Sequence, residues 1–258
     1  MSVRIDYDRS AQNWDAAAGT VYEPLGRLLL DSSPFDLAGR LMLDAGCGTG
    51  AVAQGALERG ARVVALDRSV AMLRGAGGAS LTAVAGDVLD LPFGNQGFDA
   101  VTAGFVINQV RPADGLAELA RITRPGGAVL ASTWASRPPD LVKRAMEEVL
   151  LASGWTRPPW YVSMKSTLEP TSGDPDRLAE AAREAGLTEV RATVVQADLR
   201  IGDPAAVVSY RLALPHIAEW CSGLDNARRQ ALIDQGVRAV CPLLKAWRPA
   251  VVLLSGRA

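Results

Sequence analysis

The chain is poor in the residues that build metal and disulfide sites. It has three cysteines, an odd number without C-x-x-C spacing, and a single histidine among 258 residues. A disulfide framework, a zinc site and a Ser-His-Asp triad therefore lack support, although the one histidine could still belong to a triad. We expect reduced thiols and metal-free chemistry.

Long apolar runs and an excess of one charge are also missing. The longest apolar runs, such as 250–254, have strand length, whereas a membrane span needs roughly 18 residues. Asp6 stands where a signal peptide would begin its apolar region. Lys and Arg number 27 against 28 Asp and Glu, without a basic block, so nucleic acid is not an expected partner. These absences predict a cytoplasmic protein that acts on a small molecule, away from membranes.

Apolar residues make up 48% of the chain, enough to bury a large core. Short apolar runs alternate with helical stretches, which is typical of βαβ units and a parallel sheet. We predict strands at 41–45, 62–66, 81–85, 98–103, 128–133, 189–198 and 251–254. Helices are predicted at 50–59, 69–74, 114–123 and 176–185.

A glycine-rich turn follows the first predicted strand, in the run Leu43-Asp44-Ala45-Gly46-Cys47-Gly48-Thr49-Gly50. Gly46 and Gly48 allow a tight turn and let a ligand lie against the main chain, because a Cβ there would block that approach. The same run also satisfies the loose dinucleotide fingerprint, and Asp67 follows at the distance of a ribose-binding acid. An NAD-dependent oxidoreductase is therefore one interpretation.

Three features favour a different cofactor. Asp44, just before the turn, suits an ammonium group better than a pyrophosphate. The run Gly86-Asp87-Val88 follows the third strand, where an acid and a backbone amide can pair with an adenine edge. The run Arg124-Pro125-Gly126-Gly127 predicts a sharp turn into the fifth strand.

Taken in order, these motifs resemble those of the class I S-adenosylmethionine-dependent methyltransferases, especially the branch that acts on small molecules. The resemblance covers about 7–133; its other motifs are Tyr7-Asp8-x-x-Ala11-x-x-Trp14-Asp15, Leu66-Asp67, Leu91-Pro92-Phe93 and Phe98-Asp99-Ala100-Val101. It implies an α/β, Rossmann-like fold whose seven-stranded, mostly parallel sheet has one antiparallel strand. It also implies that S-adenosylmethionine is the cofactor, bound at the carboxyl ends of the first strands.

The resemblance further implies roles for single residues. Gly46 and Gly48 would contact the methionine part, Asp67 would accept both ribose hydroxyls, and Asp87 with Val88 would address the adenine. The cofactor residues that we expect are Asp44, Ala45, Gly46, Cys47, Gly48, Asp67, Arg68, Met72, Gly86, Asp87, Val88, Gly104 and Phe105.

Several of these residues have a plainer alternative role. Asp67 at a strand end could cap the following helix, and Asp44 could accept hydrogen bonds from turn amides. Cys47 could be a small buried filler, and Met72 could belong to the core.

Large aromatic residues gather outside the predicted sheet. None of the six tryptophans falls between Asp15 and Thr133. We expect an N-terminal helical lid at 1–40, and an α/β core at 41–136, 174–202 and 249–258, with helical cap insertions at 137–173 and 203–248. Aromatic cap residues suit a flat or apolar acceptor. Alternatively, they form the hydrophobic core of the cap itself. The substrate residues that we expect are Trp14, Tyr22, Asn108, Gln109, Trp160, Tyr161, Tyr210 and Trp220.

A sulfonium donor is already activated, so the chain would mainly align the acceptor and exclude water. His216 is the titratable candidate for a catalytic base, because the reference pKa of histidine is about 6.5; a structural role is its alternative. We predict methyl transfer to a small-molecule acceptor, a secondary metabolite or a quinone-like compound. A cyclase or other non-methylating enzyme on this fold and a non-enzymatic cofactor-binding protein stay open, as does the oligomeric state.

Overall fold

The computed structural model describes residue 7, residues 11–76 and residues 81–258; of residues 11–13, 15 and 16 it describes the backbone alone. No helix in these ranges is both long enough and apolar enough to cross a membrane. The elements are, in order, α1 (Ala11–Asp31), β1 (Leu41–Ala45), α2 (Ala51–Glu58), β2 (Arg62–Asp67), α3 (Val70–Gly75), β3 (Thr82–Ala85), β4 (Phe98–Gly104), η1 (Ile107–Gln109), α4 (Pro112–Ile122), β5 (Thr123–Trp134), α5 (Leu141–Ala152), α6 (Pro159–Ser172), α7 (Pro175–Glu184), β6 (Thr188–Gln196), α8 (Pro204–Ala213), α9 (Pro215–Ser222), α10 (Asn226–Leu244) and β7 (Ala250–Arg257).

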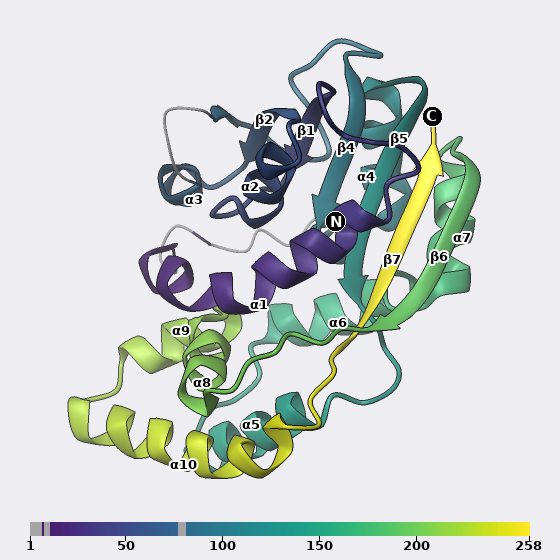
Figure 1. Ribbon diagram of the computed structural model, residues 1–258. Helices are drawn as coiled ribbons and strands as arrows, with labels where there is room; N and C mark the ends of the chain where they lie inside the picture. The colour runs from purple at the N-terminus through teal and green to yellow at the C-terminus, as the bar shows by residue number, and fades with distance from the viewer. Residues whose placement is uncertain (1–6, 8–10, 77–80) are drawn as a thin grey trace.

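The seven strands form one sheet in the order β3-β2-β1-β4-β5-β7-β6, and β7 runs antiparallel to both of its neighbours. This arrangement confirms the predicted mostly parallel sheet with one antiparallel strand (Figure 1). The chain moves outward from β1 to β3 and then returns to the other side of β1 as β4. The switch of direction between β1 and β4 leaves a crevice at their carboxyl ends, where open α/β sheets bind ligands.

Two apolar cores cover the two faces of the sheet. Successive strand residues point to opposite faces, so Met42 and Leu130 pack with α1 and α2, whereas their neighbours Leu43 and Val129 pack with α4 and α7. The first core continues into α5, α8 and α10. The added helices therefore share a hydrophobic core with the sheet.

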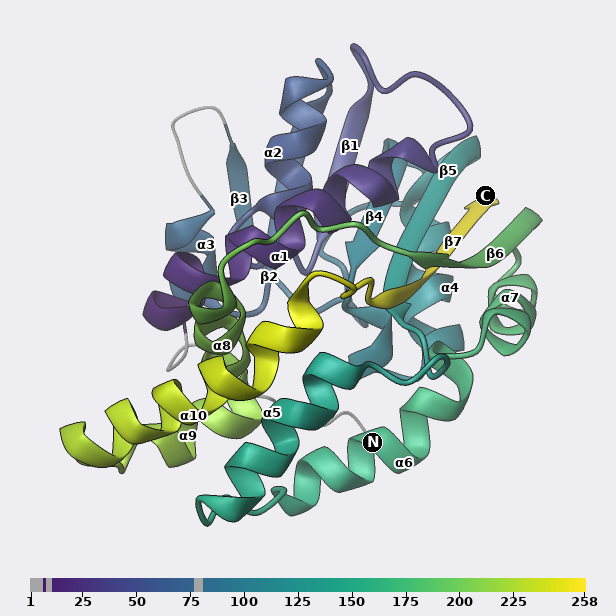
Figure 2. The same cartoon turned by 60° about the horizontal axis from the view of Figure 1, so that its bottom comes forward.

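The predicted lid and cap segments are helical. In the described part of segment 1–40 the one helix is α1, which contacts both α2 and α8 and is followed by a linker. Residue 7 is described as well, whereas residues 1–6 and 8–10 lie outside the described part. Segments 137–173 and 203–248 supply α5 and α6, and then α8, α9 and α10. Helices α5, α8 and α10 pack on one another (Figure 2). Helix α6 contacts α7 and η1 instead.

Candidate functional site

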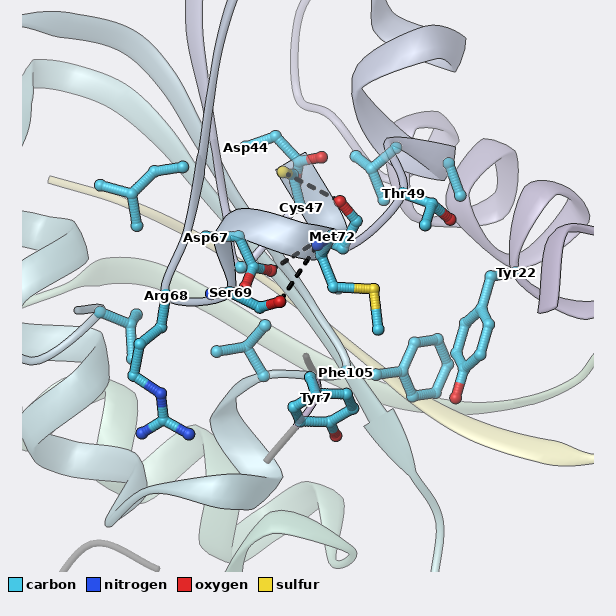
Figure 3. A pocket seen from close by; sticks show the side chains of 18 of the residues that line it. Tyr7, Tyr22, Asp44, Cys47, Thr49, Asp67, Arg68, Ser69, Met72 and Phe105 are labelled. Carbon is cyan, nitrogen blue, oxygen red and sulfur yellow. Dashed lines mark hydrogen bonds between the residues drawn. The ribbon is translucent and has the colours of Figure 1, made fainter. Parts of the chain in front are cut away.

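A cavity of about 400 Å³ lies at the carboxyl ends of β1, β2 and β4, beside α1. Figure 3 shows Asp67, Arg68 and Ser69 on one side of it and Phe105 and Tyr22 on another. Twelve of the thirteen expected cofactor residues line this cavity, namely Asp44, Gly46, Cys47, Gly48, Asp67, Arg68, Met72, Gly86, Asp87, Val88, Gly104 and Phe105. The remaining one, Ala45, is fully buried within β1. The structure thus brings the predicted set together, while the individual roles stay predictions.

The turn after β1 has a shape that side chains would disturb. Gly46 has φ +72°, and a Cβ on it would lie 2.2 Å from Cγ2 of Val106. Gly48 has φ +54°, and a Cβ there would meet nothing within 4 Å. Gly46 therefore closes the turn tightly against the loop after β4, while Gly48 exposes main chain to open space where a ligand can approach.

Asp67 ties the end of β2 to this turn. One carboxylate oxygen accepts a hydrogen bond from Gly48 N at 2.8 Å, and the other accepts one from Ser69 N at 2.8 Å. Ser69 in turn caps α3 through Met72 N at 3.1 Å. Burial raises the pKa of Asp67. Since each carboxylate oxygen can accept two hydrogen bonds, Asp67 organises the turn and keeps acceptor capacity for a ligand hydroxyl.

Asp44 anchors the start of α2 from inside the sheet. It is 1% exposed; its Oδ2 accepts from Ala53 N at 3.0 Å and its Oδ1 from Thr102 Oγ1 at 2.9 Å. Burial raises its pKa to about 7, and the neighbouring charge of Asp67 acts in the same direction. Asp44 therefore accepts hydrogen bonds from α2 and β4, and it also lines the cavity. Its contact with a cofactor stays a prediction.

Phe105, directly after β4, has φ +58°. This backbone region is costly for a residue with a side chain, and such residues cluster at functional sites. The Phe105 ring lies 4.5 Å from that of Trp134 and 5.2 Å from that of Tyr22, which stacks on Trp14 at 5.4 Å. Tyr22 also places its hydroxyl 3.5 Å from that of Tyr210. These rings form an aromatic wall between the cavity and α8.

The expected substrate residues divide into two groups. Trp14, Tyr22 and Gln109 line the cavity, and Gln109 donates from Nε2 to the carbonyl of Phe105 at 3.0 Å. The other five are outside the cavity lining: Asn108, Trp160, Tyr161, Tyr210 and Trp220. Their substrate role stays a prediction that would require an acceptor reaching beyond this cavity.

His216, on α9, stacks face to face on Tyr161, with ring centroids 3.9 Å apart and planes 3° apart. Burial lowers its pKa to about 2, and the charges of Arg211, Lys143 and Lys165 add to that shift. It is not among the residues that line the cavity. Its role as a base stays a prediction. The low pKa argues against that role, because a ring this hard to protonate is a poor proton acceptor at neutral pH.

The segment Tyr161-Val162-Ser163-Met164-Lys165 has the Tyr-x-x-x-Lys spacing used by some hydride-transfer enzymes. In the structure Tyr161 is engaged with His216, and Lys165 forms an ion pair with Glu169 one turn later on α6. Neither residue of the pair lines the cavity at the glycine-rich turn. This geometry gives no support to the NAD-dependent alternative.

Some cavity residues escaped the sequence-based set. Ser69 was detectable, because a serine three residues before Met72 at a helix start is a capping signal. Small residues on the buried face of α1 carry no such signal, and neither does Ser132 at the end of β5. The missed lining residues are Tyr7, Ala18, Gly19, Gly26, Thr49, Ala51, Val52, Ser69, Val106, Val110 and Ser132; Leu66, which also lines the cavity, is expected from the resemblance to flank the adenine with Met72.

Comparisons with known proteins show what the part of the chain that carries this site is similar to. The methyltransferase domain family matches residues 43–131. The chain is 44% identical over 117 residues to the demethylmenaquinone methyltransferase of Thermobifida fusca (strain YX), a match that covers 42% of this chain and 50% of that protein. The chain spans about half the length of the curated relatives it matches.

Solved structures resemble almost the whole chain. Phosphoethanolamine N-methyltransferase 2 of Haemonchus contortus, solved with S-adenosyl-L-methionine, matches with a TM-score of 0.57 and 17% identity, covering 90% of this chain and 52% of that one. The cyclase SpnF matches with a TM-score of 0.55 and 19% identity, covering 91% and 80%. These likenesses confirm the predicted Rossmann-like fold. Residues 43–131 therefore match the methyltransferase domain family, and the chain has the fold of solved S-adenosylmethionine-binding methyltransferases.

Proposed function

We propose that the chain binds S-adenosylmethionine in the cavity at the ends of β1, β2 and β4 and transfers its methyl group to a small-molecule acceptor. The observation that carries this proposal is the geometry at Asp67. Its carboxylate is fixed by Gly48 N and Ser69 N at the edge of a cavity, beside the main chain of Gly48, where a Cβ would meet nothing within 4 Å. This donor and acceptor set fits a ribose beside a polar amino-acid group.

The residues around the cavity suit the parts of such a cofactor. Gly46 and Gly48 would lie along the methionine part, near the carboxylate of Asp44. Asp87 and Val88, after β3, would meet the adenine. The bound cofactor would supply a methyl group on a positively charged sulfur, which needs no nucleophilic residue from the protein.

The contribution of the chain is then alignment and exclusion of water. Helix α1 borders the cavity, and the rings of Trp14, Tyr22 and Phe105 form part of the lining. Apolar rings at this position would hold a flat acceptor and keep bulk water from the reacting atoms. This wall, together with the demethylmenaquinone methyltransferase relative, supports a quinone-like or secondary-metabolite acceptor.

A calorimetric titration with S-adenosylhomocysteine tests the cofactor, with NADH as the competing ligand. We expect saturable binding of S-adenosylhomocysteine alone and at least about tenfold weaker binding by Asp67→Ala, because a charged acceptor of ligand hydroxyls is lost. Asp36→Ala is the matched control, since Asp36 accepts from Ala38 N two residues on, as Asp67 does from Ser69, but lies outside the cavity. Binding of NADH alone would refute the proposal.

A second readout separates methyl transfer from the alternative on the same fold. The cyclase SpnF shares this fold, so a non-methylating reaction is the next candidate. Incubation with S-adenosylmethionine and a panel of hydroxylated quinones should release S-adenosylhomocysteine in proportion to methylated product. Conversion of an acceptor without release of S-adenosylhomocysteine would favour the cyclase-like alternative.

A further inference from the structure

Arg211, on α8, is buried without full pairing. Its side chain is 7% exposed, and its Nε and Nη2 atoms have no hydrogen-bond partner within the described part of the chain. These two nitrogens form one edge of the planar guanidinium, the edge that can donate two parallel hydrogen bonds to a carboxylate. Leaving charged donors buried and unpaired is costly. The Nε and Nη2 edge of Arg211 is therefore a candidate binding site for an anion.

The surroundings of Arg211 are positively charged. Lys143, on α5, has its pKa lowered by burial and further by the charges of Lys165 and Arg211. The nearby acids are already engaged, because Glu169 pairs with Lys165, and Glu147 pairs with Arg157 at 3.1 Å. Glu147 and Glu169 oppose the lowering of the Lys143 pKa, but both pair with other cations, and among the described residues no carboxylate forms an ion pair with Arg211 or Lys143.

This cationic cluster adjoins the aromatic wall of the cavity. Burial raises the pKa of Tyr22, in the wall, and of Tyr161, in the cap, and the charge of Arg211 opposes both shifts. Tyr210, beside Arg211 on α8, reaches the Tyr22 hydroxyl at 3.5 Å. Figure 2 shows α8 beneath α1, with α5 close by. Helix α8 contacts both α1, which carries Tyr22, and α9, which carries His216, so Arg211 belongs to a helix that connects the cavity wall with the Tyr161–His216 pair.

Two more unpaired polar atoms lie on neighbouring elements. Nε2 of His216 on α9 and Oδ1 of Asn108 on η1 are buried without partners in the described ranges. Helix α9 contacts α8, and η1 contacts α6, which carries Tyr161. Several unsatisfied polar groups on elements that pack around one region indicate a site for a polar ligand group.

We infer that the acceptor carries a carboxylate, which Arg211 binds through its Nε and Nη2 edge with Lys143 adding positive charge, while the rest of the acceptor extends past Tyr22 into the cavity. The inference rests on the proposed function, because it names the acceptor class of that same site. A carboxylate matches the planar fork of the guanidinium. Its single negative charge is also less costly to bury among aromatic rings than the higher charge of a phosphate.

Calorimetry of the full chain with saturating S-adenosylhomocysteine tests the inference, using sodium benzoate as the carboxylate and inorganic phosphate as the comparison anion. The wild type should bind benzoate saturably and more tightly than phosphate. Arg211→Met should weaken benzoate binding at least about tenfold, because two charged hydrogen bonds are lost. The benzoate affinity of Arg211→Lys should lie between those of the wild type and Arg211→Met, since lysine keeps the positive charge but lacks the planar guanidinium. Arg238→Met, at an exposed arginine of α10, should match the wild type.

Thermal unfolding separates binding from a merely structural role. Without ligand, Arg211→Met should unfold at the same temperature as the wild type or higher, because it removes an unpaired buried charge; a structural role predicts a lower temperature. Benzoate binding that is unchanged in Arg211→Met, or weaker than phosphate binding, would overturn the inference. Absence of S-adenosylhomocysteine binding would instead refute the proposed function, and benzoate titrations without it would still report on Arg211.

Discussion

The glycine-rich turn and the cap differ in how their polar groups are satisfied. At the turn, Asp44 and Asp67 each accept hydrogen bonds with both carboxylate oxygens. In the cap, Arg211 and His216 keep buried nitrogens without partners in the described part of the chain. The turn is complete before any ligand binds, whereas the cap gains partners only when a ligand supplies them. We infer that the turn provides affinity for a fixed cofactor and the cap provides selection among acceptors.

The same difference predicts how each region contributes to the stability of the protein. A satisfied network stiffens the turn, because removal of any member leaves another buried group unpaired. An unsatisfied cluster lowers stability until its ligand arrives, as functional sites often do. Substitutions that disturb the packing of the turn should therefore destabilise the protein, whereas substitutions that remove an unpaired buried charge or nitrogen should stabilise it. The following predictions test that contrast.

The largest effect is expected for Gly46→Ala. Its φ of +72° and the 2.2 Å approach of Val106 Cγ2 combine backbone strain with overpacking. We expect a loss of about 2–4 kcal/mol in the free energy of unfolding. Gly39→Ala is the control, because Gly39 has φ +73° but a Cβ there would meet nothing within 4 Å. Gly39→Ala should lose only about 1 kcal/mol in the free energy of unfolding. Equal losses for the two variants in urea unfolding would show that the contact with Val106 does not destabilise Gly46→Ala.

Asp44 should make stability depend on pH. Its folded pKa of about 7 lies above the unfolded value near 3.9, so the folded state holds the proton longer. The contribution of Asp44 to stability is therefore fully present below about pH 4 and is lost as the pH rises to about 7, by at most about 1.4 kcal/mol per pH unit. Asp44→Asn removes this slope and should gain stability relative to the wild type between pH 5 and 7.

Urea unfolding at pH 5, 6, 7 and 8 measures this effect. The isosteric amide can still accept from Ala53 N and donate to Thr102 Oγ1, so the fold should persist. Asp36→Asn, at an exposed aspartate, is the control and should leave the pH dependence unchanged. Identical slopes in Asp44→Asn and the wild type would show that Asp44 does not hold a proton at neutral pH.

The core of the fold was predictable because main-chain geometry leaves a local record in the sequence. Strands β1, β2 and β4 lie within one residue of their predicted ends, since each is a short apolar run closed by a turn signal. The predicted start of β5 was wrong. It begins at Thr123 rather than 128, because Thr123 pairs with Phe98 before a register shift in β4. That pairing depends on a distant strand, so a local pattern does not contain it.

The cap could be outlined but not assigned a role. Its tryptophans suggested either an acceptor site or a cap core. Trp155 and Trp247 belong to the core, and their Nε1 atoms donate to His216 O at 3.0 Å and Asp140 Oδ1 at 3.1 Å. Arg211 carried no signal, because its isolation arises from helices far apart in the chain. Which cap side chains face an acceptor depends on how distant helices pack together. The sequence alone therefore does not identify these side chains.

The smallest effect is expected in the cap, for His216→Phe. The substitution keeps an aromatic ring against Tyr161 and removes the buried Nε2 atom that has no partner in the described ranges. The free energy of unfolding should rise by about 1 kcal/mol. His216→Ala is the contrasting variant; it loses the stacked ring, leaves a void and should lower stability by about 2 kcal/mol.

Turnover of the same variant tests the predicted base. Because burial holds the pKa of His216 at about 2, the ring is neutral from pH 5 to pH 8 and does not titrate in that range. The pH dependence of kcat for His216→Phe should therefore follow that of the wild type once an acceptor is found. A wild-type rise in kcat near pH 6.5 that disappears in His216→Phe would return His216 to catalysis, and would place the Tyr161–His216 pair against the reacting end of the acceptor rather than its anionic end.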